Sequence, residues 1–167
     1  MFTMLVARHA KSSWDYPELS DFERPLSARG RRDAPLMAAI LRDGPERPDV
    51  IVTSSAVRAV TTARVMAQLL DLPMHDMIIS NALYDATADE LITLVREIDD
   101  AFRCAMVVGH NPALTQFVNI VGDTELENVP TCGVVTLAFP SLRSWRDIGV
   151  RTGNVRSFDY PRKYYRE

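Results

Sequence analysis

The sequence has few cysteines, and their placement excludes the kinds of site that cysteine usually marks. Its 167 residues include only Cys104 and Cys132, which lie far apart and lack paired or histidine-flanked spacing. A disulfide framework or a zinc site is expected to show such spacing. We therefore expect two buried free thiols, and no metal or other cofactor.

Long apolar runs and an excess of positive charge are missing as well. The first apolar run ends at Arg8, which is too early for a signal peptide or a membrane-spanning helix. The formal net charge is −3, so we expect no general attraction to nucleic acid or to anionic membranes. Together these absences predict a cytoplasmic location, with neither nucleic acid nor membrane as a partner.

The remaining composition fits one folded unit. Hydrophobic residues make up 47% of the chain, which is enough to bury a core at this length. Short apolar strands alternate with segments of helical periodicity, and this alternation predicts a parallel sheet covered by helices on both faces. We therefore expect a single domain over residues 1–167, with a three-layer α/β/α fold and a mostly parallel central sheet.

Local signals place several elements of this fold. Ser27 is expected to cap a helix, with Pro35 inside it either kinking the helix or delaying its start. Residues 133–139 and 145–150 alternate in polarity and are expected to form an antiparallel pair. For the tail over residues 156–167, a packed and a loose arrangement both stay open.

Three of the expected strands end in side chains that bind anions. Arg8 and His9 follow the first apolar run, Arg58 follows the run that begins at residue 49, and His110 follows the run at residues 105–108. In open α/β sheets, ligands bind at the carboxyl ends of the strands. Two arginines and two histidines at such an edge, without a cysteine or serine nucleophile motif, indicate a site that handles a phosphoryl group.

Two of these strand ends are also expected to precede helices. With Ser55 as the N-cap, Arg58 lies in the first helical turn, near free backbone N–H groups and the positive end of the helix dipole. Asn111 is expected to cap the next helix, and Pro112 suits its first position, which places His110 beside a second helix N-terminus. Both arrangements favour an anion.

Each of these residues alone has an ordinary structural explanation. Arg8 and His9 would be a solvated pair after a strand, Arg58 a helix-surface charge, and His110 a histidine bonded to a nearby carbonyl. Their coincidence at three equivalent strand ends favours a shared site.

Three stretches of the chain carry a resemblance to a known family. Residues 8–11, Arg-His-Ala-Lys, resemble the Arg-His-Gly signature of the histidine phosphatase superfamily, with Ala10 in place of the usual glycine. Residues 54–63 resemble its second motif and residues 108–112 its third. The likeness covers nearly the whole chain and is greatest to the short SixA-type phosphohistidine phosphatases, which residues 24–30 also resemble. It implies a phosphatase with the fold of the cofactor-dependent phosphoglycerate mutases.

The expected mechanism follows from this set of residues and the family resemblance. Neutral His9 attacks phosphorus and becomes phosphorylated, after which water releases phosphate without a metal. Arg8 and Arg58 are expected to lower the pKa of His9. They also bind the phosphoryl oxygens, with His110 as a further donor. Asn111, beside His110, is another candidate phosphate ligand.

Two further residues have two explanations each. From its family context, Arg24 is a third guanidinium for the phosphate, but it also has Asp21 and Glu23 nearby as surface partners. Asp85 lies close to where many superfamily members carry an acidic proton donor, or it starts the turn before Thr87.

The expected substrate is a phosphohistidine carried on a protein. The chain has no long insertion that would close a lid over a small metabolite. A small-molecule phosphomonoesterase is the alternative, and a non-catalytic phosphate-binding module is a less favoured one. The complete set of His9, Arg58 and His110 argues against the module.

Overall fold

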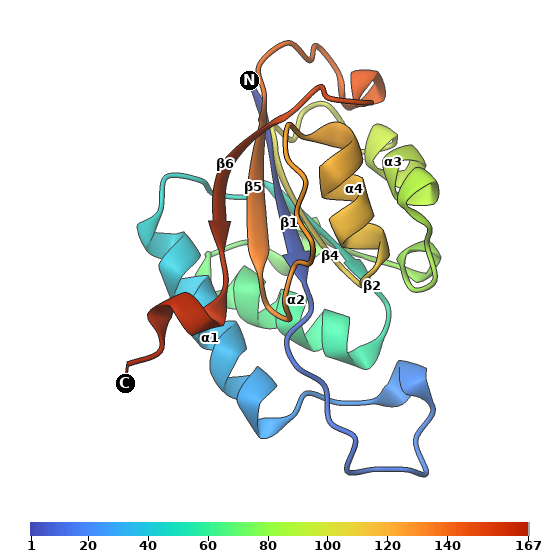
Figure 1. The fold of residues 1–167 in the computed structure, drawn as a ribbon, viewed down its shortest axis with the longest axis vertical. Helices are drawn as coiled ribbons and strands as arrows, with labels where there is room; N and C mark the ends of the chain where they lie inside the picture. The colour runs from blue at the N-terminus through green and yellow to red at the C-terminus, as the bar shows by residue number, and fades with distance from the viewer. Residues whose placement is uncertain (167) are drawn as a thin grey trace.

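A computed structural model describes residues 1–166 as three layers, with a sheet between two pairs of helices (Figure 1). The six strands lie in the order β3-β2-β4-β1-β5-β6. Their bounds are Phe2–Arg8 for β1, Val50–Ser54 for β2, Met77–Ser80 for β3, Cys104–Gly109 for β4, Val134–Phe139 for β5 and Asn154–Asp159 for β6. Helices α1 (Ala28–Asp43) and α2 (Val57–Leu69) cover one face, and α3 (Ala88–Arg96) and α4 (Ala113–Val121) cover the other. The predicted three-layer fold is confirmed.

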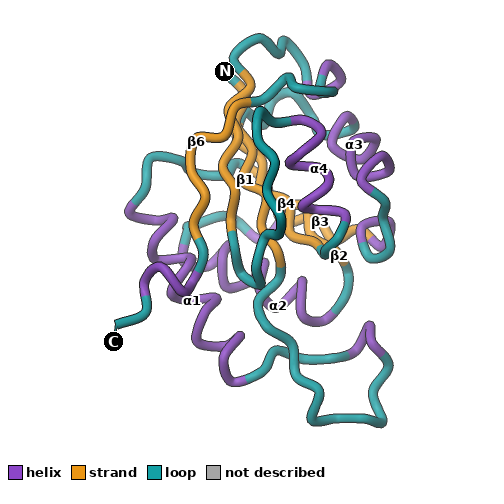
Figure 2. Tube along the Cα trace, in the orientation of Figure 1, coloured by secondary structure: helices purple, strands orange, loops and turns teal. Residues whose placement is uncertain are grey.

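The alternation of side chains along β1 explains why its run is apolar at every position. Met4 and Val6 belong to the core cluster beneath α3 and α4, whereas Leu5 and Ala7 belong to the cluster beneath α1 and α2. Successive side chains of a strand point to opposite faces, so a strand covered on both sides favours apolar residues at successive positions. The central position of β1 between the helices is visible in Figure 2.

The sheet is parallel where the candidate residues lie. Strands β2, β4 and β1 are neighbours and run in the same direction, with Arg8 opposite Gly109 and Thr53 opposite Val108. On the other side of β1, β5 pairs antiparallel with β1, and β6 pairs antiparallel with β5. This confirms the predicted mostly parallel sheet. Because parallel neighbours end at the same edge, the residues that follow β1, β2 and β4 are brought side by side.

The helix starts agree in part with the predicted caps. Ser27 Oγ accepts a hydrogen bond from the first turn of α1, as predicted, and α1 continues through Pro35 with no delay of its start. Ser55 does not cap α2. The N-cap residue is Ala56, and no side chain caps the first turn of α2. The Ala56 N–H donates to Ser54 Oγ, whereas Ser55 Oγ is buried without a hydrogen-bond partner among the described residues.

Helix α4 begins one residue later than predicted. Its first residue is Ala113, so Pro112 precedes the helix. Asn111 still supplies a capping oxygen, because its Oδ1 accepts a hydrogen bond of 3.2 Å from Thr115 N.

The region after β5 differs from the prediction. Residues 145–150 form no strand, and β5 pairs with β1 and β6 instead. Trp145 starts a short 3₁₀ segment and is fully buried, with its Nε1 donating to Phe102 O at 2.8 Å and its ring 4.8 Å from that of Phe2. Burial of a large aromatic ring with its N–H satisfied outweighs a local alternation of polarity.

The tail packs against the domain as far as the structure describes it. After β6, Pro161–Tyr164 forms a 3₁₀ segment, and Tyr165 Oη donates to Asp33 Oδ1 of α1 at 2.6 Å. Glu167, the last residue of the tail prediction, lies outside the described residues. Within residues 1–166, no helix is both long and apolar enough to cross a membrane.

Candidate active site

A cavity of about 250 Å³ opens at the carboxyl edge of β1, β2 and β4. Six of the seven predicted site residues line it: Arg8, His9, Arg24, Arg58, His110 and Asn111. They arrive from the ends of β1 and β4, from the first turn of α2, and from the loop over residues 12–26. The predicted convergence of three strand ends is therefore observed, and Arg24 belongs to the same cavity.

His9 is held in one orientation by its neighbour. Its Nδ1 lies 2.7 Å from Ala10 O, and because a carbonyl only accepts, Nδ1 carries the proton and donates. The lone pair is then on Nε2, which has no hydrogen bond to any described residue. His9 is 7% exposed, and its backbone N–H donates to Gly109 O at 3.1 Å. Strand β4 therefore positions the residue, and the Ala10 carbonyl sets its tautomer.

The pKa of His9 is lowered to about 3. Burial is the largest cause, and the positive charges of His110, Arg58 and Arg8 add to it, while the Ala10 carbonyl acts in the opposite direction. The two arginines thus act in the predicted direction, but desolvation contributes more than they do. His9 is neutral at pH 7.

Ala10 is held in turn by α2, through a residue that the sequence did not single out. Its N–H donates to Thr62 Oγ1 at 3.0 Å, and that hydroxyl donates to Arg58 O at 2.8 Å. Both Ala10 and Thr62 are fully buried. The carbonyl that orients His9 is therefore tied to the helix that carries Arg58.

His110 faces His9 across the cavity, with ring centroids 5.0 Å apart. Its Nε2 forms a 2.7 Å hydrogen bond with Ser54 Oγ at the end of β2, and its Nδ1 is buried without a partner in the described chain. Burial, and next the charge of Arg58, lower its pKa to about 4. The sequence did not assign Ser54 to the site, and its bond to His110 depends on β2 and β4 being neighbours.

Three buried or half-buried guanidinium groups surround the histidines. Arg8 donates from Nη1 to Val129 O at 3.1 Å, and burial lowers its pKa, with the charge of Arg58 second. Arg24 donates to Ser12 Oγ, and its guanidinium carbon lies 3.4 Å from the centroid of the Trp14 ring.

Asp21 is the most informative residue that the sequence did not assign to the site. Arg58 Nη1 donates to its backbone oxygen at 2.7 Å and Arg58 Nη2 to its carboxylate at 3.0 Å. Tyr84 Oη donates to the same carboxylate at 2.6 Å, and Arg24 lies 3.4 Å from it. The bond from Tyr84 and then that from Arg58 hold the pKa of Asp21 below its usual value. Arg24 therefore both pairs with Asp21 and lines the cavity.

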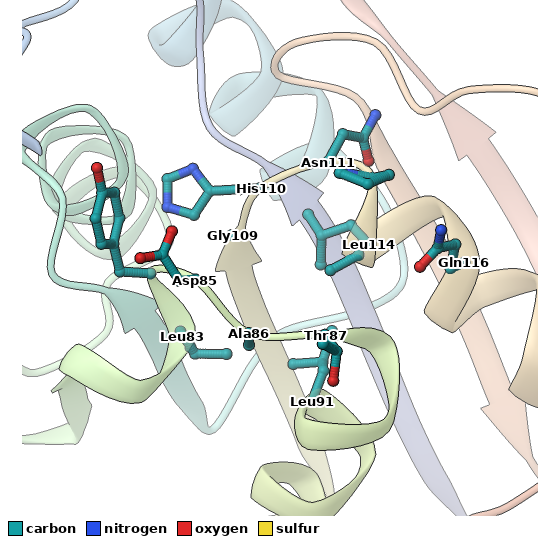
Figure 3. Close-up of a pocket in the computed structure, with 13 residues that line it drawn as sticks. Leu83, Asp85, Ala86, Thr87, Leu91, Gly109, His110, Asn111, Leu114 and Gln116 are labelled. Atoms are coloured by element: carbon teal, nitrogen blue, oxygen red, sulfur yellow. The ribbon is translucent and has the colours of Figure 1, made fainter. Parts of the chain in front are cut away.

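Asp85 lies outside this cavity. It is exposed and lines a second cavity of about 270 Å³ between the starts of α3 and α4, which shares His110 and Asn111 with the first. Figure 3 shows the Asp85 carboxylate on the His110 side of this second cavity. It is thus close to the site without belonging to the set around His9.

Neither cysteine side chain lines the cavity of His9. Cys104 and Cys132 are buried free thiols, as predicted, and burial raises the pKa of each to about 12, so neither is a thiolate at neutral pH. Across the described residues there is no cluster of three or more His, Cys, Asp or Glu side chains suited to a metal ion.

Acid is expected to destabilise the fold through His9 and His110. Because both folded-state pKa values lie below 6.5, the unfolded chain binds protons as the pH falls from 6.5 towards 4, and the folded chain does not. The stability that the two neutral histidines contribute is therefore present above pH 6.5, and it is lost progressively as the pH falls from 6.5 towards their folded-state pKa values. Between pH 7 and pH 5, each histidine is expected to lower the free energy of unfolding by about 2 kcal/mol.

Urea unfolding at both pH values measures this effect in wild type, His9→Gln and His110→Gln. His75→Gln is the matched control, since its side chain is 81% exposed. The loss of stability at pH 5 should shrink in the first two variants and persist in the control. The same loss in all four proteins would contradict the assignment.

The sequence matches a known family over the part of the chain that holds two of the three motifs. The profile of the Histidine phosphatase superfamily (branch 1) matches residues 4–83. An uncharacterized protein of Mycobacterium tuberculosis is 28% identical over 166 residues, covering 93% of this chain and 99% of its own.

Solved structures extend the similarity to almost all of the chain. A SixA protein of Agrobacterium tumefaciens has a TM-score of 0.79 at 24% identity, covering 96% of this chain and 98% of its own. The protein histidine phosphatase SixA complexed with tungstate has a TM-score of 0.78 at 19% identity, covering 98% and 100%. A phosphoserine phosphatase of Entamoeba histolytica has a TM-score of 0.65 at 14% identity, covering 95% and 97%. These structures establish a SixA-like, phosphoglycerate mutase-like fold for the chain, and the profile shows that residues 4–83 are similar to the Histidine phosphatase superfamily (branch 1).

Proposed function

We propose that the protein hydrolyses phosphohistidine in a protein substrate, through a phosphorylated intermediate on His9. The match of residues 4–83 to the profile of the Histidine phosphatase superfamily supports phosphatase activity. The observation that carries the proposal is the state of His9: its ring is neutral, Nδ1 is bonded to Ala10 O, and Nε2 is unpaired in a cavity lined by three guanidinium groups. Such an arrangement combines a nucleophile with a binding site for an anion.

In the first step, the Nε2 lone pair of His9 forms a bond to phosphorus. The bond from phosphorus to the leaving group breaks, and its electron pair goes to that group. Negative charge spreads over the equatorial oxygens, where Arg8, Arg58 and His110 Nδ1 are placed to donate. No side chain has to lose a proton before attack, because Nε2 is already free.

In the second step, water attacks phosphorus and the bond to His9 Nε2 breaks. The electron pair returns to the ring, which keeps the proton on Nδ1, and the protons of the water leave with phosphate. Dividing one displacement into two lets the same donors stabilise both transition states. A SixA protein of the same fold has been solved with tungstate, an oxyanion, and this supports the binding of an oxyanion by this fold.

His9→Ala is expected to abolish turnover, since it removes the proposed nucleophile. Wild type, mixed with substrate and quenched rapidly, should carry phosphate on His9 that is labile to acid and stable to alkali. Phosphopeptide mapping after an alkaline quench locates it, and His75→Ala serves as the matched histidine control. Substantial activity in His9→Ala, with phosphate on another residue or on none, would remove the assignment.

Arg58→Lys is expected to lose most of its activity although the charge is kept. One edge of the guanidinium binds Asp21, which leaves further N–H groups for phosphate oxygens, and a lysine cannot provide both in a fixed plane. A loss of about 10² to 10³ in kcat/KM is expected, by analogy with the removal of an oxyanion donor. Arg64→Lys, on the same helix but outside the cavity, is the control. Near-normal rates in Arg58→Lys would exclude a role in transition-state binding.

The alternative function is hydrolysis of a small phosphate monoester. The fold is shared with a phosphoserine phosphatase, and the second cavity beside His110 has room for a leaving group. The two functions differ in what the leaving group needs. An alkoxide requires a proton from a general acid, whereas a phosphohistidine protonated on its other ring nitrogen leaves as neutral imidazole.

Asp85→Asn separates these possibilities. If phosphohistidine is the substrate, the variant should slow its hydrolysis only mildly, but slow hydrolysis of an alkyl phosphate by about 10² to 10⁴, the usual worth of a general acid. Both substrates are measured with wild type and variant, and Asp89→Asn, in the first turn of α3, is the control. A large and equal loss on both would favour the monoesterase, and no loss on either would make Asp85 a turn residue.

A further inference from the structure

The loop over residues 12–26 exposes large aromatic side chains beside the cavity. Trp14 is 73% exposed, Tyr16 49% and Phe22 37%, so three of the exposed large hydrophobic residues fall within nine positions. Tryptophan, tyrosine and phenylalanine are enriched at the centres of protein interfaces, because they bury much area for little loss of conformational entropy. Figure 1 shows this loop extending beyond the carboxyl edge of the strands.

The same loop is acidic on its outer side. It carries four carboxylates and one arginine, and Asp15, Glu18 and Glu23 are all exposed. Among the described residues, the side chains of Asp15 and Glu18 have no hydrogen-bond or ion-pair partner, and Glu23 binds only Ser20 Oγ of its own turn. These charges therefore stabilise no contact within the domain that the structure records.

The inner side of the loop is part of the candidate active site. Ser12, Trp14 and Arg24 line the cavity of His9, and Asp21 binds Arg58. A phosphorylated side chain on a protein, inserted far enough to reach His9, brings its flanking residues against this loop.

We propose that the outer side of residues 12–26 is a docking surface for a protein substrate with lysine or arginine residues flanking its phosphorylated side chain. The inference rests on the proposed function and specifies its substrate. Charge complementarity determines the choice of occupant. The guanidinium groups deep in the cavity attract the phosphoryl group, and the outer carboxylates attract cationic flanks while repelling a small ligand with several phosphates. The aromatic rings supply apolar and cation–π contacts with the stems and heads of those flanks.

Binding is measured first, because it does not depend on turnover. The chain has two tryptophans, Trp14 exposed on this loop and Trp145 fully buried, so a change in intrinsic fluorescence on peptide binding reports on the loop. The probes are two unphosphorylated peptides with a central histidine, one flanked by lysine and arginine and the other by glutamate and aspartate. We expect the basic peptide to bind at least tenfold more tightly at low salt, with the ratio falling at 0.5 M NaCl.

The variant Asp15→Asn/Glu18→Gln tests the surface, because neither residue lines the cavity. It should weaken binding of the basic peptide about three- to tenfold, the effect of two exposed charge interactions, and should not weaken binding of the acidic one. The matched control is Asp43→Asn/Glu97→Gln, which removes the same charge from the carboxyl ends of α1 and α3, at the opposite edge of the sheet. Circular dichroism confirms that both variants fold.

Kinetics then separate this proposal from the proposed function. With phosphohistidine forms of both peptides and with p-nitrophenyl phosphate, the variant should raise KM for the basic peptide alone. Failure of wild type to hydrolyse any of the three would refute the phosphatase while the binding result still decides the docking surface. Three results would each overturn the docking surface. The first is equal affinity of wild type for both peptides, and the second is equal weakening of binding by the test and control variants. The third is a Trp14 signal that depends on protein concentration without peptide, which would indicate a second copy on this face.

Discussion

The hydrogen bond from His9 Nδ1 to the Ala10 carbonyl determines what the rest of the site is able to do. It selects one tautomer of a neutral ring and leaves Nε2 unprotonated, which no amount of positive charge nearby would achieve by itself. The bond in turn depends on distant parts of the fold, because β4 holds the backbone of His9 and Thr62 of α2 holds that of Ala10. Both contacts exist only when β1 is inserted beside β4 and packed against α2, so the state of one ring nitrogen depends on the assembled sheet.

Keeping this edge of the sheet buried has a cost in stability. Desolvation disfavours the charged form of Arg8 and of both histidines, and the nearby cations repel one another. The histidines avoid the cost by staying neutral. The arginines cannot do so, and part of their cost is offset by Asp21, whose carboxylate binds Arg58 and lies near Arg24. Two hydrophobic clusters, one on each face of the sheet, supply the stability that allows such a site to persist.

The sequence was informative where a local pattern has only one physical explanation. An unbroken apolar run such as residues 4–7 fits a strand covered on both faces, and the residue after such a strand must lie at the ligand-binding edge, so Arg8, His9 and His110 were predicted together. Apart from the local errors at Ser55 and Pro112, what the sequence missed came from long-range contacts. Trp145 lies in an alternating segment, yet its ring packs against Phe2 from the other end of the chain. Asp21 lies 37 residues from Arg58, and no spacing rule indicates that the loop between β1 and α1 folds back far enough for them to meet.

Because the loop between β1 and α1 folds back onto Arg58, its residue Asp21 contributes to the charge of the cavity and also lies on the outer surface. With both histidines neutral, the groups Arg8, Arg24, Arg58 and Asp21 carry two net positive charges, and Lys11 in the cavity lining adds a third, so the cavity favours an anion. Asp21 is a member of that balance and also a residue of the exposed acidic loop, where Tyr84 holds its carboxylate in place. A ligand that displaces the loop would therefore change both the orientation of Arg58 and the net charge around His9. The carboxylate of Asp21 thus belongs both to the outer loop and to the charged groups around His9.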